Sequence, residues 1–76
     1  MSTIEQLKEI FVEQTGRDAD SFNEDTVFTV DLVMNSFEIF GLICDVEEHF
    51  DIEIPDRELM KLVTVGDLVK YIEENA

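Results

Sequence analysis

The spacing of apolar residues constrains the fold of this chain more than any other feature, because it follows the helical period in three segments. The first segment runs from Ser2 to Gln14, and its apolar residues recur at helical spacing, at Ile4, Leu7, Ile10 and Phe11. Spacings of three and four residues place such side chains on one face of a helix. Ser2 and Glu5 have the spacing of a capping box, and Gly16 is a typical helix stop. We therefore predict a first helix that ends at Gly16.

Two later segments show the same period. Residues 36–50 carry an apolar stripe at positions i, i+4, i+7 and i+11, which are Ile39, Ile43, Val46 and Phe50. The last segment begins after Thr64, which can cap it together with Asp67, although Gly66 weakens its first turn. Its apolar stripe consists of Val65, Leu68, Val69 and Ile72. Between these helices, Pro55 disfavours helical dihedral angles at the residue before it, so we predict a break there and a short helix over Asp56 to Leu62.

Residues 17–34 fit neither the helical nor the strand period. They mix acidic, Ser, Asn and Thr residues with isolated apolar ones, so we predict a long loop that is anchored by its aromatic side chains. Long ordered loops in small domains are commonly functional or wrap around a bundle. The predicted fold class is all-α, a small bundle of three main helices and one short helix with a long first loop. A chain of 76 residues suffices for one domain, which we expect to span 1–76.

The charge balance narrows the choice of partners. The chain has 19 acidic and 5 basic residues, a net charge of −14, yet 45% of its residues are hydrophobic, so it should fold. The negative charge argues against nucleic acid and anionic membrane surfaces and favours basic protein partners. With no apolar run of about 18 residues and no signal-peptide pattern at the N-terminus, we expect a soluble, cytoplasmic monomer without membrane insertion. The single cysteine, Cys44, allows no internal disulfide.

The head of the second predicted helix offers a position suited to a phosphate group. Asn35 and Glu38 stand three residues apart, so Asn35 can cap this helix while Glu38 places a negative charge in its first turn. Ser36 then occupies the first helical position, and the cap does not consume its hydroxyl. A phosphate is well tolerated at a helix N-terminus, where backbone N–H groups and the helix dipole both favour an anion. Ser36 is therefore the candidate site of modification.

The same segment carries more apolar surface than one helix face can bury. Phe37, Phe40 and Cys44 form a second apolar row at positions i, i+3 and i+7. If this row is buried, it belongs to the core or lines a cavity. If it is exposed, it is a strip for binding a partner, with an acidic rim. The acidic residues that we expect to contact a partner there are Glu38, Asp45, Glu47 and Glu48.

The sequence resembles acyl carrier proteins nearly from end to end. The stretches that carry the resemblance are Asp31-Leu-Val-Met-Asn-Ser36-Phe37, Val46-Glu-Glu-His-Phe-Asp-Ile-Glu-Ile-Pro-Asp56 and Thr64-Val-Gly-Asp-Leu-Val-Lys-Tyr-Ile72. The resemblance implies that Ser36 carries 4′-phosphopantetheine, transferred from coenzyme A by a phosphopantetheinyl transferase. It also implies that acyl groups, held on the cofactor thiol as thioesters, are presented to the basic docking surfaces of enzymes of fatty acid, lipid or polyketide-type biosynthesis. The chain would then be a carrier and not an enzyme.

Several positions depart from the family pattern. Asn35 stands where the family usually has Asp, Phe37 where it has Leu, and Val33 where Gly is common. In the family, that Asp is part of what the transferase recognises, so Asn35 leaves open how efficiently this chain is modified and by which transferase. Together with the bulky Phe40 and the mid-helix Gly41, these differences suggest a specialised carrier with partners of its own.

Two other functions fit the same residues. An aminoacyl or peptidyl carrier would share the attachment at Ser36, although the acidity and the Glu-Ile-Pro-Asp stretch favour acyl cargo. An unmodified acidic adaptor would keep the fold and use the Phe37, Phe40 and Cys44 row only to bind a protein. We expect no metal site, because the lone His49 has no second ligand at a suitable spacing and the acidic residues form no calcium loop. No set of catalytic residues is evident.

Overall fold

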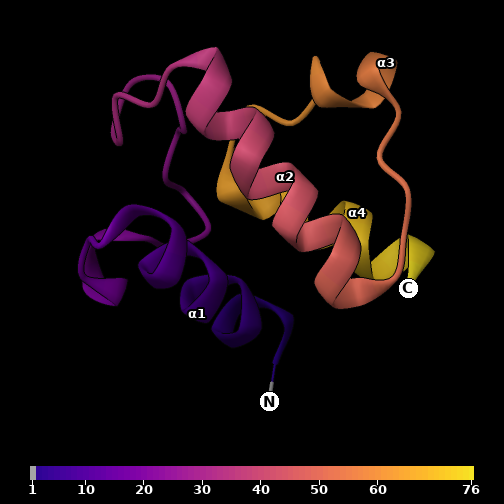
Figure 1. Ribbon diagram of the computed structural model, residues 1–76, viewed down its shortest axis with the longest axis horizontal. Coiled ribbons are helices and arrows are strands. Elements are labelled where there is room, and N and C mark those ends of the chain that lie inside the picture. The colour runs from indigo at the N-terminus through magenta and orange to yellow at the C-terminus, as the bar shows by residue number, and fades with distance from the viewer. Residues whose placement is uncertain (1) are drawn as a thin grey trace.

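Five helical segments make up the structure, a computed structural model that describes residues 2–76 (Figure 1). In chain order they are α1 (Thr3–Thr15), the 3-10 turn η1 (Ala19–Ser21), α2 (Ser36–Phe50), α3 (Asp56–Leu59) and α4 (Val65–Asn75). Within the described residues no strand is formed, and β-type pairing is limited to one isolated bridge between Val27 and Thr64. The prediction of three main helices and one short helix is confirmed.

Helix α1 begins and ends where its capping residues predict. The Ser2 side chain accepts a hydrogen bond from the Glu5 N–H, and Gly16 adopts a left-handed conformation with φ of 75°. Glycine reaches this region without steric cost, and the Gly16 N–H closes the helix on the Val12 carbonyl at 2.8 Å. The helix lies against both α2 and α4, whereas α3 sits at the opposite end of the molecule (Figure 1). Helix α1 therefore contacts both of the other long helices of the bundle.

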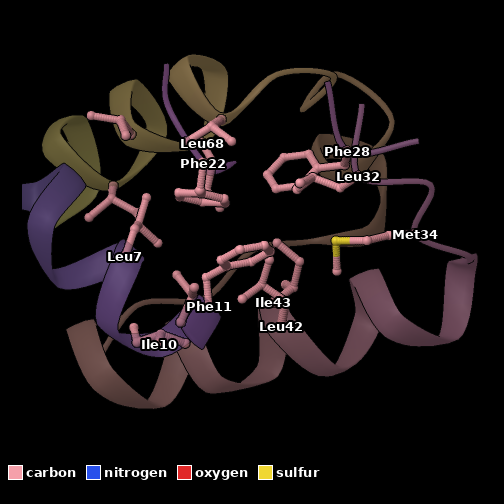
Figure 2. Packing of buried hydrophobic residues seen from close by; sticks show 14 of the residues in the cluster. Leu7, Ile10, Phe11, Phe22, Phe28, Leu32, Met34, Leu42, Ile43 and Leu68 are labelled. Atoms are coloured by element: carbon pink, nitrogen blue, oxygen red, sulfur yellow. The ribbon is translucent and has the colours of Figure 1, made fainter. Parts of the chain in front are cut away.

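The long loop between α1 and α2 supplies a large part of the core. Its buried side chains are Phe22, Phe28, Leu32 and Met34. The Phe22 ring stacks on Phe11 of α1 with a centroid distance of 4.3 Å and lies 6.4 Å from the Phe28 ring. Figure 2 shows these side chains pointing into the same interior as those of the helices. The loop is therefore anchored by its aromatic residues, as predicted, although the 3-10 turn within it was not.

Gly66 allows the long loop to lie against the start of α4. The Gly66 N–H donates to the Glu24 carbonyl at 2.8 Å, and the Val65 N–H donates to the Thr26 carbonyl at 2.9 Å. A Cβ atom on Gly66 would stand only 2.9 Å from the Glu24 oxygen, too close for an undistorted contact. The sequence predicts only a cost for this glycine in the helix, whereas the structure shows the close backbone approach that requires it.

The buried face of α2 is shifted relative to the predicted stripe. Ile43 and Val46 are buried as predicted, but Leu42 is also fully buried, while Ile39 and Phe50 are only partly buried against the core. The stripe of four residues was too narrow, because the apolar face of a globular helix spans more than 100°. Helix α3 is also shorter than the predicted range of 56–62, since residues 60–62 continue as tighter turns with bonds between residues three apart.

Candidate functional site

Ser36 is the first residue of α2 and is exposed to solvent. The residues beside it complete the cap without using its hydroxyl. Asn35 Oδ1 accepts from the Glu38 N–H at 2.8 Å, and Glu38 Oε1 accepts from the Asn35 N–H at 3.2 Å. This is the predicted capping box. Within residues 2–76 the Ser36 hydroxyl makes no hydrogen bond, so its oxygen is available for chemistry.

The first turn of α2 also leaves two backbone donors available. Every α-helix begins with N–H groups that have no partner within the helix. In α2 the cap uses those of Asn35 and Glu38, whereas those of Ser36 and Phe37 have no partner in the described part of the chain. Together with the helix dipole they favour a negative group at this end. The residues present thus fit a phosphodiester on Ser36, because they offer both the attachment oxygen and donors for the charge.

The segment that leads into Ser36 is held by bonds within the loop. Asp31 Oδ2 accepts from the Val27 N–H at 2.8 Å, and the Met34 N–H donates to the Phe28 carbonyl at 3.0 Å. The side chains on both sides of Val33 are buried, while Val33 itself has φ of 52° and an exposed side chain. Sequence reasoning identified Val33 only as a departure from a common glycine. Its left-handed conformation depends on how the loop folds back on Phe28, which no local pattern reveals.

The second apolar row of α2 lies at the surface. Phe37 is 86% exposed and Phe40 is 58% exposed, and the Cys44 thiol is free and exposed. These side chains therefore form an exposed apolar row on α2 and are not part of the core. Glu48 is also exposed and stands one helical turn after Cys44, so it continues the same face. The outer face of α2 is thus apolar near Ser36 and acidic towards its C-terminal end.

The acidic side chains that were expected to contact a partner have different environments. Glu38 is half-buried in the cap, and Glu48 lines, together with the half-buried Asp45, a hollow between α1 and α2. Glu47 is half-buried, and its Oε2 accepts from the Ile54 N–H at 2.8 Å. This bond holds the chain after α2 against the helix end. Its role escaped the sequence analysis because it depends on the left-handed turn at Asp51, where φ is 55°.

A second hollow, of about 290 Å³, lies between the end of α1 and the first turns of α2. Its lining residues are Gln14, Thr15, Phe37, Glu38 and Gly41. A Cβ atom on Gly41 would stand 2.6 Å from Nε2 of Gln14, so the missing side chain lets this amide lie against α2. The mid-helix glycine, which the sequence suggests is only a cost, thus leaves room beside α2 for the end of the Gln14 side chain.

Two further properties concern metals and membranes. In the region from Ser2 to Ala76, no group of three or more His, Cys, Asp or Glu side chains is arranged to hold a metal ion. His49 instead faces α1, with its Nε2 atom 3.0 Å from Oε1 of Gln6. None of the helices described here has the length and apolar character needed to cross a membrane.

Known proteins resemble this chain over its whole length. The family model described as a phosphopantetheine attachment site matches residues 5–72, a range that includes Ser36. An acyl carrier protein of Wolinella succinogenes is 41% identical over 75 residues, which cover 99% of each chain. The structure of the acyl carrier protein from Enterococcus faecalis matches with a TM-score of 0.80 at 25% identity, with both chains fully covered. The chain therefore belongs to the acyl carrier protein family and is a carrier protein, not an enzyme.

Proposed function

We propose that Ser36 carries 4′-phosphopantetheine and that the loaded protein holds acyl groups as thioesters for enzymes of fatty acid, lipid or polyketide-type biosynthesis. The observation that supports this function most is the exposed hydroxyl at the first position of a fully capped helix. Membership of a family that is defined by phosphopantetheine attachment supports the same assignment. The acidity of the chain favours acyl over aminoacyl cargo.

The residues around Ser36 suit modification by a phosphopantetheinyl transferase. Asn35 and Glu38 satisfy each other, so the Ser36 oxygen is free to attack the phosphorus atom that bears the pantetheine of coenzyme A. The new oxygen–phosphorus bond forms as the hydroxyl loses its proton, and adenosine 3′,5′-bisphosphate leaves. The free N–H groups at the helix end favour the charge of the phosphodiester. When attached, the group supplies a thiol on a flexible arm that can reach several active sites.

The outer face of α2 is the proposed docking surface for acyl-processing enzymes. It presents an apolar strip followed by acidic residues, which matches partners with basic surfaces around an apolar centre. A carrier that visits many enzymes needs fast and weak association, and a net charge of −14 steers it towards basic surfaces. The residues proposed to contact partners are Phe37, Glu38, Phe40, Cys44, Asp45, Glu47 and Glu48.

A monomeric carrier in the cytoplasm is part of the same proposal. The core of the chain is enclosed by its own helices and loop, with no second copy needed to cover it. The exposed, unpaired Cys44 thiol is compatible with a reducing compartment, where thiols stay free.

Intact-mass measurement after incubation with coenzyme A and a broad-specificity transferase tests the function. We expect the wild type to gain the mass of one phosphopantetheine and Ser36→Ala to gain none. Ser21→Ala is the matched control, because Ser21 is another exposed serine, and it should be modified like the wild type. An unchanged wild-type mass under conditions that load a known carrier would favour the adaptor function. The mass of the cargo on protein isolated from cells separates acyl from aminoacyl carriers.

A further inference from the structure

Val33 is held in a backbone conformation that β-branched residues rarely adopt. Its φ angle of 52° lies in the left-handed region, where the Cβ atom of an L-residue meets the following carbonyl oxygen. The loop requires this turn, because Leu32 and Met34 on either side are both buried and the Met34 N–H bonds back to the Phe28 carbonyl. Glycine would satisfy the same turn without the steric cost.

The Val33 side chain contributes nothing to the core that would offset this cost. It is 74% exposed and lies outside the buried cluster. Residues in sparsely populated conformations are concentrated at functional sites, where the strain accompanies a role in binding or catalysis. An exposed apolar side chain at such a position therefore points to a contact with another molecule.

The position of Val33 indicates which molecule that is. Val33 lies three residues before Ser36, and Phe37 lies directly after Ser36. Two exposed apolar side chains therefore flank the Ser36 hydroxyl along the chain. The two polar side chains next to the hydroxyl each use one oxygen atom in the helix cap. Asn35 is uncharged and its Oδ1 binds the Glu38 N–H, while the Glu38 carboxylate binds the Asn35 N–H. Within three residues of Ser36, the exposed side chains that make no hydrogen bond in the described part of the chain are those of Val33 and Phe37, and both are apolar.

We propose that the phosphopantetheinyl transferase that loads this carrier recognises it through apolar contacts with Val33 and Phe37 on either side of Ser36. This inference rests on the proposed function. The transferase is the partner because it must enclose the Ser36 hydroxyl itself, and in doing so it covers the neighbouring side chains. Enzymes that act on the cargo reach it through a long arm, so they can dock on Phe37 and the rest of α2 without enclosing the Ser36 hydroxyl or Val33. The surface of the transferase that meets this carrier should then be an apolar cleft. It would not need a basic side chain to bind an acidic residue at position 35, where this chain has Asn.

Loading kinetics of two matched valine variants test the contact. The assay uses the full chain, coenzyme A and whichever transferase of the source cell loads the wild type best, with the carrier concentration varied. Val33→Ala removes the isopropyl group and should raise KM about tenfold, the fold-change expected when burial of a valine side chain is lost, with little change in kcat. Val12→Ala makes the same change at an exposed valine of α1 and should leave KM unchanged.

Val33→Gly separates recognition from folding. It relieves the left-handed strain, so its melting temperature should rise by about 5 °C, while its KM should rise as in Val33→Ala. A stabler protein that is loaded less well cannot be explained by a purely structural role of Val33. Unchanged KM values for both Val33 variants would overturn the recognition proposal while leaving Ser36 as the attachment site, since the wild type is loaded in the same assay. If no transferase loads the wild type, both this proposal and the proposed function fail.

Discussion

Glu47→Ala should destabilise the protein, although it removes one negative charge from a chain with 19 acidic residues. The Glu47 side chain accepts from the Ile54 N–H at 2.8 Å, and its carbonyl accepts from the Ile52 N–H at 3.1 Å. One residue thus fixes the reversal of the chain at the C-terminal end of α2. The Ile54 side chain is only 5% exposed, so its N–H has little access to a replacement partner.

The size of the effect follows from the hydrogen bond and its surroundings. A hydrogen bond to a charged group contributes about 1.5–3 kcal/mol, and the half-buried position of Glu47 favours the lower limit. Relief of charge repulsion offsets a few tenths of a kcal/mol at most, because exposed charges interact weakly in water. We expect a net loss of about 1.2 kcal/mol in the free energy of unfolding. In a domain of this size that corresponds to a melting temperature about 5–10 °C lower.

Glu48→Ala provides the matched control. It removes the same charge from the next residue, whose exposed carboxylate makes no hydrogen bond within residues 2–76. Its melting temperature should equal or slightly exceed that of the wild type, and Glu47→Gln, which keeps an acceptor oxygen, should lie between the two alanine variants. The three melting temperatures are measured by thermal unfolding followed by circular dichroism. All samples have the same ionic strength, because salt screens the repulsion between the acidic side chains. Equal melting temperatures for Glu47→Ala and Glu48→Ala would refute the reasoning.

Two further outcomes concern other helix caps. Asn35→Asp keeps the capping acceptor and restores the charge that the family usually has at this position. It should therefore be loaded faster by a transferase that recognises an acid, and equal loading rates for the two forms would show that the transferase does not recognise this charge. At Asp67, hydrogen bonds from the Thr64 and Val63 N–H groups lower the pKa below its ordinary value of 3.8. Its stabilising contribution is therefore complete above that value and lost as the pH falls through the lower folded pKa. Asp67→Asn should therefore lose less stability than the wild type as the pH falls through this range. Identical acid-unfolding curves for the two proteins would contradict this contribution of Asp67.

Helix ends were predictable from the sequence because caps are local. Ser2, Asn35 and Thr64 each accept from an N–H group three residues later, so their partners could be identified without knowledge of the fold. The freedom of the Ser36 hydroxyl followed from the same local argument. The buried face of α2 was only partly predictable, because Leu42 is buried by elements that pack on α2 from elsewhere in the chain.

Features that depend on distant backbone contacts were not predictable. Gly66 and Glu24 are far apart in sequence, and only the folded chain shows that their backbones meet. The bond between Glu47 and Ile54 requires a left-handed turn at Asp51. Asp tolerates this conformation better than most residues, but the sequence does not show that the chain folds back there. In each case the residue type was visible in the sequence, but its purpose depends on a partner that packing brings into place.

The exposure of the second row of α2 illustrates the same limit and has a functional consequence. A helix with apolar residues on two sides can be buried through either, and the periodicity alone does not decide between them. Here Leu42 and Val46 belong to the same buried cluster as residues of α1 and the long loop, and Phe37 and Phe40 are left at the surface of the helix that Ser36 begins. The exposed face is thus apolar where the cofactor would be attached and acidic further along. In the proposed function, loading draws on the apolar end of this face, whereas docking also draws on its acidic end, so substitution of the acidic residues should alter docking without altering loading.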